Sequence, residues 1–353
     1  NHGVLKRRPF GLGSLIAGCP CLAAVVVGKG VAQFETAPAA IGLARPVSPF
    51  EVLDLIRRIF VGIHQADTFT GVCQRAGKIA HNVSRLMELY GSKGLGISAV
   101  TKVVCGNPDI AQVLIQAGIG VLADSRIANI IRMRDAGIEA QFLLLRTPFL
   151  SEAETVVKYA DLSLNSDLSV IEELSRFALM QNIKHRIILM VELGDLREGL
   201  MPPDVNSGVE FVLELDGIEL AGIGANLACF GGIKPDNENM GQLSLIAKEI
   251  EEKFGLTLSF VSGGNSANYE WFMSTPDMGM INNLRLGESI YLGCETLHRK
   301  SIPGLFTDAF TLFAEVIESS IKPSLPYGEV CQDVSGQVPK FQDLGQIRRA
   351  ILG

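Results

Sequence analysis

Histidine is scarce in this sequence, and its cysteines are not paired. The chain has five histidines and seven cysteines among 353 residues, and no two cysteines show the spacing of a zinc ribbon. Scattered thiols in odd number are typical of a protein kept reduced, not of a disulfide framework. We therefore expect no metal site, and we expect a cytoplasmic protein.

Concentrated positive charge is also missing. The net charge is −7 and the isoelectric point is about 5.4. After residue 10 no stretch combines lysine and arginine with aromatic residues, so nucleic acid is not an expected partner. The composition is 47% hydrophobic and 20% charged, which allows a large aliphatic core and excludes wholesale disorder.

The first 65 residues differ from the rest of the chain. Three basic residues at 6–8 precede an apolar run over Phe10–Val27, in which Leu15–Cys19 resembles a lipoprotein cleavage site. Pro20 interrupts this run, which is too short for a membrane span, so we expect no membrane partner. Two interpretations stay open for residues 1–65: an atypical extension that is not native, or a targeting segment.

From Gly94 onward, short β-branched runs alternate with amphipathic segments of helical period. The eight expected strands are Gly96–Val104, Gly120–Ala123, Gln141–Leu145, Leu162–Asn165, Arg186–Glu192, Leu220–Leu227, Thr257–Ser262 and Asn283–Leu292. The helices between them include Pro108–Ala117, Ser125–Ala136, Asp167–Gln181 and Gly241–Phe254. Eight strand–helix units predict an α/β fold, a (β/α)8 TIM-type barrel. A doubly wound open sheet is the alternative, but no Gly-x-Gly-x-x-Gly turn follows the first strand.

The pattern changes again after Gly293. Apolar and polar residues alternate over Phe306–Glu318, which is typical of a half-buried strand, and a second apolar run occupies Arg348–Leu352. We interpret this segment as the start of a β-rich C-terminal domain that is incomplete at Gly353. The expected domains are thus the extension at 1–65, the barrel at 66–300 and the truncated β domain at 301–353.

Lys102 is the first candidate for chemistry. Functional residues of a barrel gather at the C-terminal ends of its strands, and Lys102 lies at the end of the first expected strand in an otherwise apolar stretch. Desolvation lowers the pKa of an amine and makes it a better imine-forming nucleophile. The alternative is a lysine that reaches solvent at the rim of the barrel.

Three other strand ends carry candidates. The loop Ser262–Ser266 after the seventh strand offers backbone N–H groups to a phosphate, unless it is only a glycine-rich turn. Arg285 in the eighth strand needs an acceptor, either a cofactor ring nitrogen or a carboxylate such as that of Glu288. Arg197, after the fifth strand, can fork onto a substrate carboxylate or pair with an aspartate at the surface. A lysine, a phosphate cradle and two arginines together suit pyridoxal phosphate.

Seven strings of residues support this interpretation. They are Lys78–Asn82, Thr101–Val103, Ala123–Arg126, Leu162–Ser166, Gly194–Gly199, Ser262–Ser266 and Asn282–Glu288. In this order they resemble the fold-type III pyridoxal-phosphate racemases, and the ornithine racemase branch more than the alanine racemases proper. The resemblance extends from Gly77 to Leu352. One departure is the stretch Thr70–Ala76, where the first strand of the family is not recognisable.

The resemblance implies a role for each matching residue. Lys102 corresponds to the lysine that forms the Schiff base and acts as one of two catalytic bases, and Arg285 to the arginine that hydrogen-bonds the pyridine nitrogen. Arg197 matches a substrate-carboxylate arginine, and Asp124 is a candidate for the δ-ammonium of ornithine. The implied cofactor-binding set is Lys102, Asn226, Ser262, Gly264, Asn265, Ser266, Arg285 and Gly287, with Asn226 near a ring-stacking position.

The expected function is therefore that of a homodimeric, pyridoxal-phosphate-dependent racemase, an isomerase that interconverts L- and D-ornithine by two-base proton transfer. Racemisation of alanine or of many amino acids is one alternative. The other is a pyridoxal-phosphate carrier with little turnover. In alanine racemases the second base is a tyrosine of the C-terminal domain that reaches across the dimer, and its segment would follow Arg348–Leu352.

Overall fold

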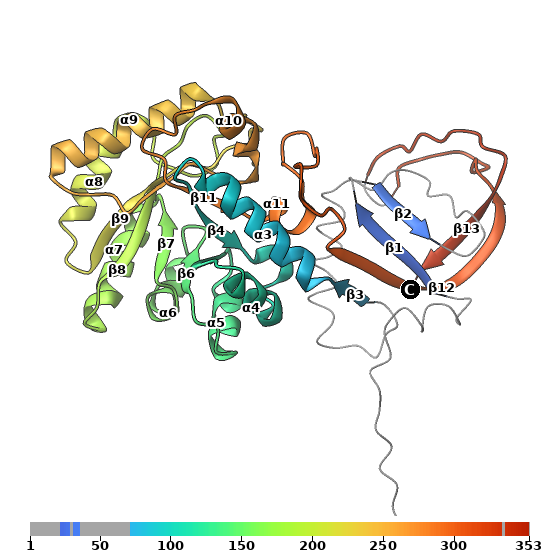
Figure 1. Cartoon of the computed structure of the whole chain (residues 1–353), viewed down its shortest axis with the longest axis horizontal. Coiled ribbons are helices and arrows are strands. Elements are labelled where there is room, and N and C mark those ends of the chain that lie inside the picture. Colours follow the sequence, from blue (N-terminus) through green and yellow to red (C-terminus); the bar gives the residue numbers. More distant parts are fainter. Residues whose placement is uncertain (1–21, 29–30, 36–70, 334–335, 353) are drawn as a thin grey trace, which may run out of the picture. The chain divides into compact units, whose positions relative to one another are not determined.

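Eight parallel strands close into a barrel in residues 75–309, the larger of the two units that the chain forms (Figure 1). The computed structural model describes residues 22–28, 31–35, 71–333 and 336–352. Around the barrel the strand order is β10-β11-β4-β5-β6-β7-β8-β9. This confirms the predicted (β/α)8 fold.

The barrel strands are short, and they agree with the predicted runs at most of their starts. They are β4 (Gly96–Val100), β5 (Val121–Asp124), β6 (Gln141–Leu144), β7 (Leu162–Asn165), β8 (His185–Met190), β9 (Ile218–Gly224), β10 (Phe260–Ser262) and β11 (Asn283–Leu286). Aliphatic side chains from β4 to β9 meet in one core cluster: Val100, Ala123, Leu143, Leu162, Leu164, Ile188, Met190 and Ala221.

Five strands (β4, β6, β8, β9 and β11) end earlier than the sequence predicts, and the difference is largest for β4 and β11. β4 stops at Val100, and Lys102 begins a 3-10 turn over Lys102–Val104 instead of lying in the strand. β11 stops at Leu286, and helix α11 (Glu288–Leu292) follows directly. In both places aliphatic residues lie shortly after the strand end: Val103 and Val104 after β4, and Ile290 and Leu292 after β11. Burial inside a turn or helix selects the same residue types, so hydrophobicity alone does not locate the strand end.

Helices connect the strands on the outside of the barrel. They are α3 (Ala76–Gly91), α4 (Pro108–Gln116), α5 (Ile127–Asp135), α6 (Ala153–Tyr159), α7 (Leu168–Met180), α8 (Val205–Leu213), α9 (Asn237–Phe254) and α10 (Tyr269–Ser274), with 3-10 turns at Leu150–Glu152, Pro202–Asp204 and Ser266–Asn268. Their starts follow ordinary capping rules: Asn107 and Asp167 accept backbone N–H bonds at the starts of α4 and α7.

The smaller unit is an antiparallel sheet built from both ends of the chain. Its strands are β1 (Leu22–Gly28), β2 (Val31–Glu35), β3 (Gly71–Gln74), β12 (Phe310–Pro323) and β13 (Gln346–Leu352). β12 pairs with β1, β3 and β13, and β2 pairs with β1. The expected C-terminal strands are therefore present, and a strand also occupies 71–74, where none was recognised.

Most of residues 1–65 lie outside the described residues, including the basic residues and the lipoprotein-like string. In the part of the chain that is described, no helix is long and apolar enough to cross a membrane.

Gly222 tests the packing of the barrel wall. A Cβ at this residue of β9 lies 1.9 Å from the carbonyl oxygen of Phe260 in β10, so Gly222→Ala must separate two paired strands. We expect it to lower the free energy of unfolding by about 1–3 kcal/mol. Gly241 in α9 is the control, because a Cβ there meets no atom within 4 Å. Gly241→Ala should leave urea unfolding unchanged or stabilise by up to about 1 kcal/mol. Equal midpoints for the two variants would contradict the packing.

Candidate active site

The candidate residues of three strands gather at one end of the barrel. Lys102 follows β4, Arg197 follows β8, and Arg285 lies in β11. The ammonium group of Lys102 is within electrostatic range of Arg197 and Arg285, and also of Cys229 and Asp124. The structure thus brings together the lysine and both arginines that the sequence singled out.

Lys102 lies in the open mouth of the barrel. The residue as a whole is exposed, but its amine is partly desolvated by the protein around it. Burial lowers the pKa of its amine below the ordinary value, and the positive charges of Arg197 and Arg285 act in the same direction. Cys229 and Asp124 oppose the shift without cancelling it. A larger share of the amine is therefore neutral at pH 7 than for an ordinary surface lysine.

Asp124 lies beside the lysine but faces away from solvent. Its side chain is fully buried, and it accepts hydrogen bonds from Thr101 Oγ1 at 2.8 Å, from the backbone N–H of Arg126 at 2.9 Å and from Asn129 Nδ2 at 3.0 Å. With three donors and no exposure, the carboxylate is not open to a substrate ammonium, contrary to our expectation. It instead holds Thr101, the residue before Lys102.

Arg285 is held by a buried polar column inside the barrel. Its Nη1 donates to Ser262 Oγ at 2.5 Å, and Nη2 donates to the carbonyl oxygen of Ala225 at 2.7 Å. Ser262 Oγ in turn donates to Asn283 Oδ1 at 2.9 Å, and Asn283 Nδ2 donates to Ser98 Oγ at 3.1 Å. Burial lowers the pKa of Arg285 to about 10, so it remains a cation at neutral pH.

The ion pair of Arg285 with Glu288, the alternative that the sequence left open, does not form. Glu288 pairs with Arg299 instead. The acceptors of the Arg285 guanidinium in the described chain are one hydroxyl and two carbonyl oxygens, all neutral. A buried cation without a carboxylate partner is costly unless another group shares its charge.

The loop after β10 has the geometry of an anion cradle. Gly264 has φ +138°, and a Cβ there would lie 2.3 Å from Asn268 Oδ1, so only glycine fits. Asn265 fixes the loop by donating from Nδ2 to Asn226 Oδ1 at 3.0 Å and to the carbonyl oxygen of Leu227 at 2.9 Å. Asn226, which the resemblance puts near a ring-stacking position, is thereby held against this loop.

Unused donors point to an anion at this place. Among the described residues, no acceptor bonds the backbone N–H groups of Gly264, Ser266 and Gly287. Ser266 Oγ lies 3.0 Å from Ser289 Oγ, which joins the loop after β10 to the start of α11. Three free N–H groups and two hydroxyls from adjacent strand ends suit a phosphate. The residues present therefore fit the phosphate of the expected cofactor.

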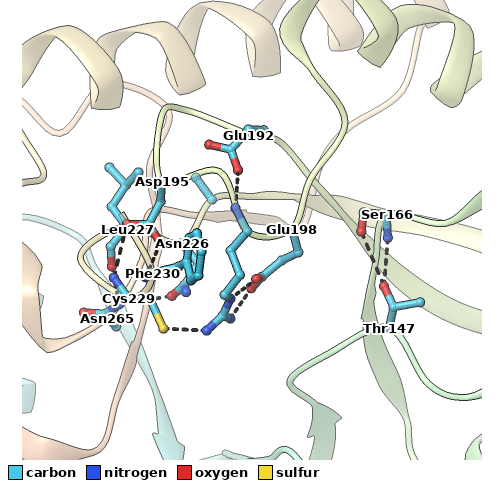
Figure 2. Close-up of polar contacts among 12 residues, drawn as sticks. Thr147, Ser166, Glu192, Asp195, Glu198, Asn226, Leu227, Cys229, Phe230 and Asn265 are labelled. Carbon is cyan, nitrogen blue, oxygen red and sulfur yellow. Dashed lines mark hydrogen bonds and ion pairs between the residues drawn. The ribbon is translucent and has the colours of Figure 1, made fainter. Parts of the chain in front are cut away.

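Arg197 already has an anionic partner. Its guanidinium forks onto the carboxylate of Glu198 through Nε and Nη2, and Nη1 contacts the thiol of Cys229 (Figure 2). The Glu198 hydrogen bonds are the largest cause of a raised pKa at Arg197. The alternative role predicted for this arginine was an ion pair with an aspartate. The ion pair is present, but the partner is a glutamate, the next residue in the chain.

Two other carboxylates fix the loops that carry Arg197 and Cys229. Asp195 accepts from the N–H groups of Cys229 at 3.2 Å, of Phe230 at 2.7 Å and of Ile233 at 3.4 Å. Glu192 accepts from the N–H groups of Gly194 at 2.6 Å and of Arg197 at 3.1 Å (Figure 2). The loops after β8 and β9 are thus tied into one wall of the mouth.

Across the mouth, hydroxyl groups link the next strand ends. Thr147 Oγ1, after β6, accepts from the backbone N–H of Ser166, after β7, at 3.1 Å (Figure 2). The Ser166 of this pair belongs to one of the quoted strings, Leu162–Ser166. The contact joins two loops and gives that string a structural role.

Sequence reasoning missed three residues of the site: Cys229, Glu198 and Asn283. Glu198 and Asn283 lie inside the strings Gly194–Gly199 and Asn282–Glu288, but only other residues of these strings, the arginines among them, were predicted to be site residues. Cys229 lies five residues after the end of β9, a position at the barrel mouth that the strand order alone could have indicated. Cys229 and Asn283 contact residues of other loops and strands, so their contacts are not visible in one segment of sequence. Glu198 contacts its neighbour Arg197 through side-chain rotamers that a residue pattern does not specify.

Asp195 gives the site a pH dependence. Burial alone would raise the pKa of its carboxylate, but the N–H groups of Phe230, Cys229 and Ile233 outweigh burial and lower the pKa. A lowered folded pKa contributes stability above the unfolded pKa of about 4, and this contribution is lost as the pH falls through the folded value. Asp195→Asn should therefore cost about 1–3 kcal/mol at pH 7.

Urea unfolding at pH 7 and at pH 3 measures this effect. The difference between the parent and Asp195→Asn should shrink at the lower pH. Asp216, an exposed acid in the turn after α8, supplies the control, and Asp216→Asn should change neither midpoint. A difference that is the same at both pH values would show that the charge of Asp195 is not what ties the loops.

Comparison with known proteins agrees with this geometry. The sequence profile of the alanine racemase N-terminal domain matches residues 75–294. An ornithine racemase of Acetoanaerobium sticklandii is 40% identical over 276 residues, 78% of each chain. A lysine racemase of Thermotoga maritima is 39% identical over 277 residues, 78% of this chain and 77% of the relative. Among solved structures, an alanine racemase of Clostridium difficile 630 in complex with cycloserine has a TM-score of 0.59 at 18% identity, covering 81% of this chain and 83% of its own, which supports the fold. The chain belongs to the alanine racemase family.

Proposed function

We propose that this racemase binds pyridoxal phosphate on Lys102 and interconverts L- and D-ornithine. The observation that supports this most is the meeting of Lys102, Arg285 and a cradle of free backbone N–H groups at one mouth of the barrel. Members of the family are pyridoxal-phosphate enzymes, which is consistent with that set of residues.

The cradle residues would hold the phosphate. The N–H groups of Gly264, Ser266 and Gly287 are directed to no acceptor in the described chain, and the hydroxyl of Ser266 lies beside them. Asn226 and Asn265 keep the loop in place through their mutual hydrogen bond. Arg285, whose charge has no carboxylate partner, would face the ring nitrogen.

Lys102 would serve both attachment and proton transfer. When bound, pyridoxal phosphate supplies an electron sink for the charge that develops at the substrate α-carbon. The lowered pKa of Lys102 allows its neutral amine to accept the α-proton on its own face near neutral pH. Arg197 would orient the substrate carboxylate by a bidentate contact.

The distal group of the substrate follows from the relatives. The two relatives that match over about 276 residues are named for ornithine and lysine, whereas those named alanine racemase match at 28% to 32% over 127 to 194 residues. Both long matches concern amino acids with a distal ammonium. Lysine is accordingly the second candidate substrate, ahead of alanine.

Borohydride reduction tests the attachment. The purified protein loaded with pyridoxal phosphate should lose its visible absorbance band on reduction, and the cofactor should remain covalently on Lys102 in peptide mass spectra. Lys102→Ala should abolish both the fixation and the racemisation of ornithine. Lys248, exposed on α9, is the control, because Lys248→Ala should change neither. Fixation on another lysine would overturn the assignment.

Ser266→Asp tests the cradle. A carboxylate about 4 Å from the phosphate costs on the order of 4 kcal/mol at an effective dielectric of about 20, or about a thousandfold in the Kd for pyridoxal phosphate. Ser266→Ala removes one hydroxyl without adding charge and should cost only about 1 kcal/mol. Fluorescence titration with the cofactor measures both constants, and thermal unfolding checks that the variants fold. If Ser266→Asp binds pyridoxal phosphate as tightly as the parent, the loop is only a turn and does not hold the phosphate.

A further inference from the structure

Four carboxylates belong to the loops at the mouth of the barrel, and three of them are fully engaged. Asp124 accepts three donors and is completely buried. Asp195 and Glu192 accept backbone N–H groups that hold their own loops together. None of these three can turn to a ligand without dismantling a loop.

Glu198 differs from the other three acids. Its partner is a side chain, the guanidinium of Arg197, and 24% of its own side chain is exposed. Its charge is also felt by Arg285, so it lies at the mouth and not on the outer surface. An ion pair between two side chains can be exchanged at little cost in backbone structure.

The backbone around the pair is rigid. A Cβ at Gly199, whose φ is +136°, would lie 2.4 Å from the backbone nitrogen of Glu192, and Leu200 is bridged to Val191. The Arg197 N–H is fixed on Glu192 at 3.1 Å. The ends of this loop therefore stay in place, and the freedom that remains belongs to the side chains of Arg197 and Glu198.

Substrate binding must break the Arg197–Glu198 pair if Arg197 is to receive the α-carboxylate. Both Nε and Nη2 are taken by Glu198 in the structure. Once a substrate carboxylate takes over the fork, the carboxylate of Glu198 is left beside the ligand without its partner. A diamino acid carries the missing cation itself.

We propose that Glu198 is the specificity-determining residue that accepts the distal ammonium of a diamino-acid substrate. This rests on the proposed function. One ion pair of the free protein is replaced by two in the complex, one at each end of the ligand. With a substrate such as alanine or norvaline, the Arg197–Glu198 pair is replaced only by the pair of Arg197 with the substrate carboxylate. Glu198 is then left unpaired. Discrimination thus arises from an unpaired charge in the complex with the wrong ligand.

Binding of two analogues that cannot racemise tests this without turnover. α-Methylornithine and α-methylnorvaline lack an α-proton and differ at the distal ammonium. Isothermal calorimetry with the pyridoxal-phosphate-loaded protein should show tighter binding of α-methylornithine. Glu198→Gln keeps the shape of the side chain and removes its charge, so it should weaken α-methylornithine by about 10–100-fold. It should leave α-methylnorvaline unchanged or tighter, since Arg197 becomes free.

Glu198→Asp and Glu173→Gln complete the experiment. The aspartate keeps the charge and should retain part of the preference. Glu173 on α7 makes the same bidentate contact with Arg176 at 2.8 and 2.6 Å on the exposed surface. Glu173→Gln therefore removes an equivalent Glu–Arg ion pair away from the mouth and serves as the control. Glu173→Gln should leave both affinities unchanged.

The outcomes separate the two proposals. Equal affinity of the parent for both analogues, or a preference for α-methylornithine that survives in Glu198→Gln, would overturn the role of Glu198. Equal weakening of both analogues would overturn it as well, because Glu198 would then act only by positioning Arg197. The proposed racemase function is tested separately, by the interconversion of L- and D-ornithine in the parent. If the parent racemises ornithine but Glu198→Gln keeps the preference for α-methylornithine over α-methylnorvaline, only the role of Glu198 is contradicted.

Discussion

Closure of the barrel between β10 and β11 is the constraint on which the site depends. The two strands share a single ladder pair, Ser262 with Asn283, and the hydrogen bond between their side chains reinforces it at 2.9 Å. Arg285 donates to the same Ser262 hydroxyl. The bonds that complete the barrel are therefore the bonds that position the buried guanidinium, and the fold cannot relax at this seam without moving it.

At the rim of the barrel, buried carboxylates fix the loops in a similar way. Asp195 and Glu192 use their charges to bind backbone N–H groups, so the loops after β8 and β9 form one wall. Asp124 does this for the residue before Lys102 through Thr101. Asp124 and Glu192 thus fix the backbone beside Lys102 and at Arg197, two cations of the mouth.

The fold could be predicted from the sequence because its signals are local. Eight alternating units and their cap residues each lie within a short segment, and the barrel follows from their number. The end of β4 was set too late because Val103 and Val104 suit a buried turn as well as a strand. The candidate residues Lys102, Arg197 and Arg285 were found because each stands at a strand end. The engagement of Asp124 and the pair of Arg197 with Glu198 depend on rotamers and on contacts between loops, which no residue pattern specifies.

The lumen of the barrel has two chemically different halves. The strands from β4 to β9 contribute aliphatic side chains to the interior cluster, and on the other side β10 and β11, together with Ser98 of β4, contribute Ser262, Asn283 and Arg285. The polar half is fixed by a continuous chain of hydrogen bonds, and the aliphatic half only by volume. A substitution in the aliphatic half can therefore be compensated by a neighbour of complementary volume. A substitution in the polar half instead leaves a buried donor or acceptor without its partner.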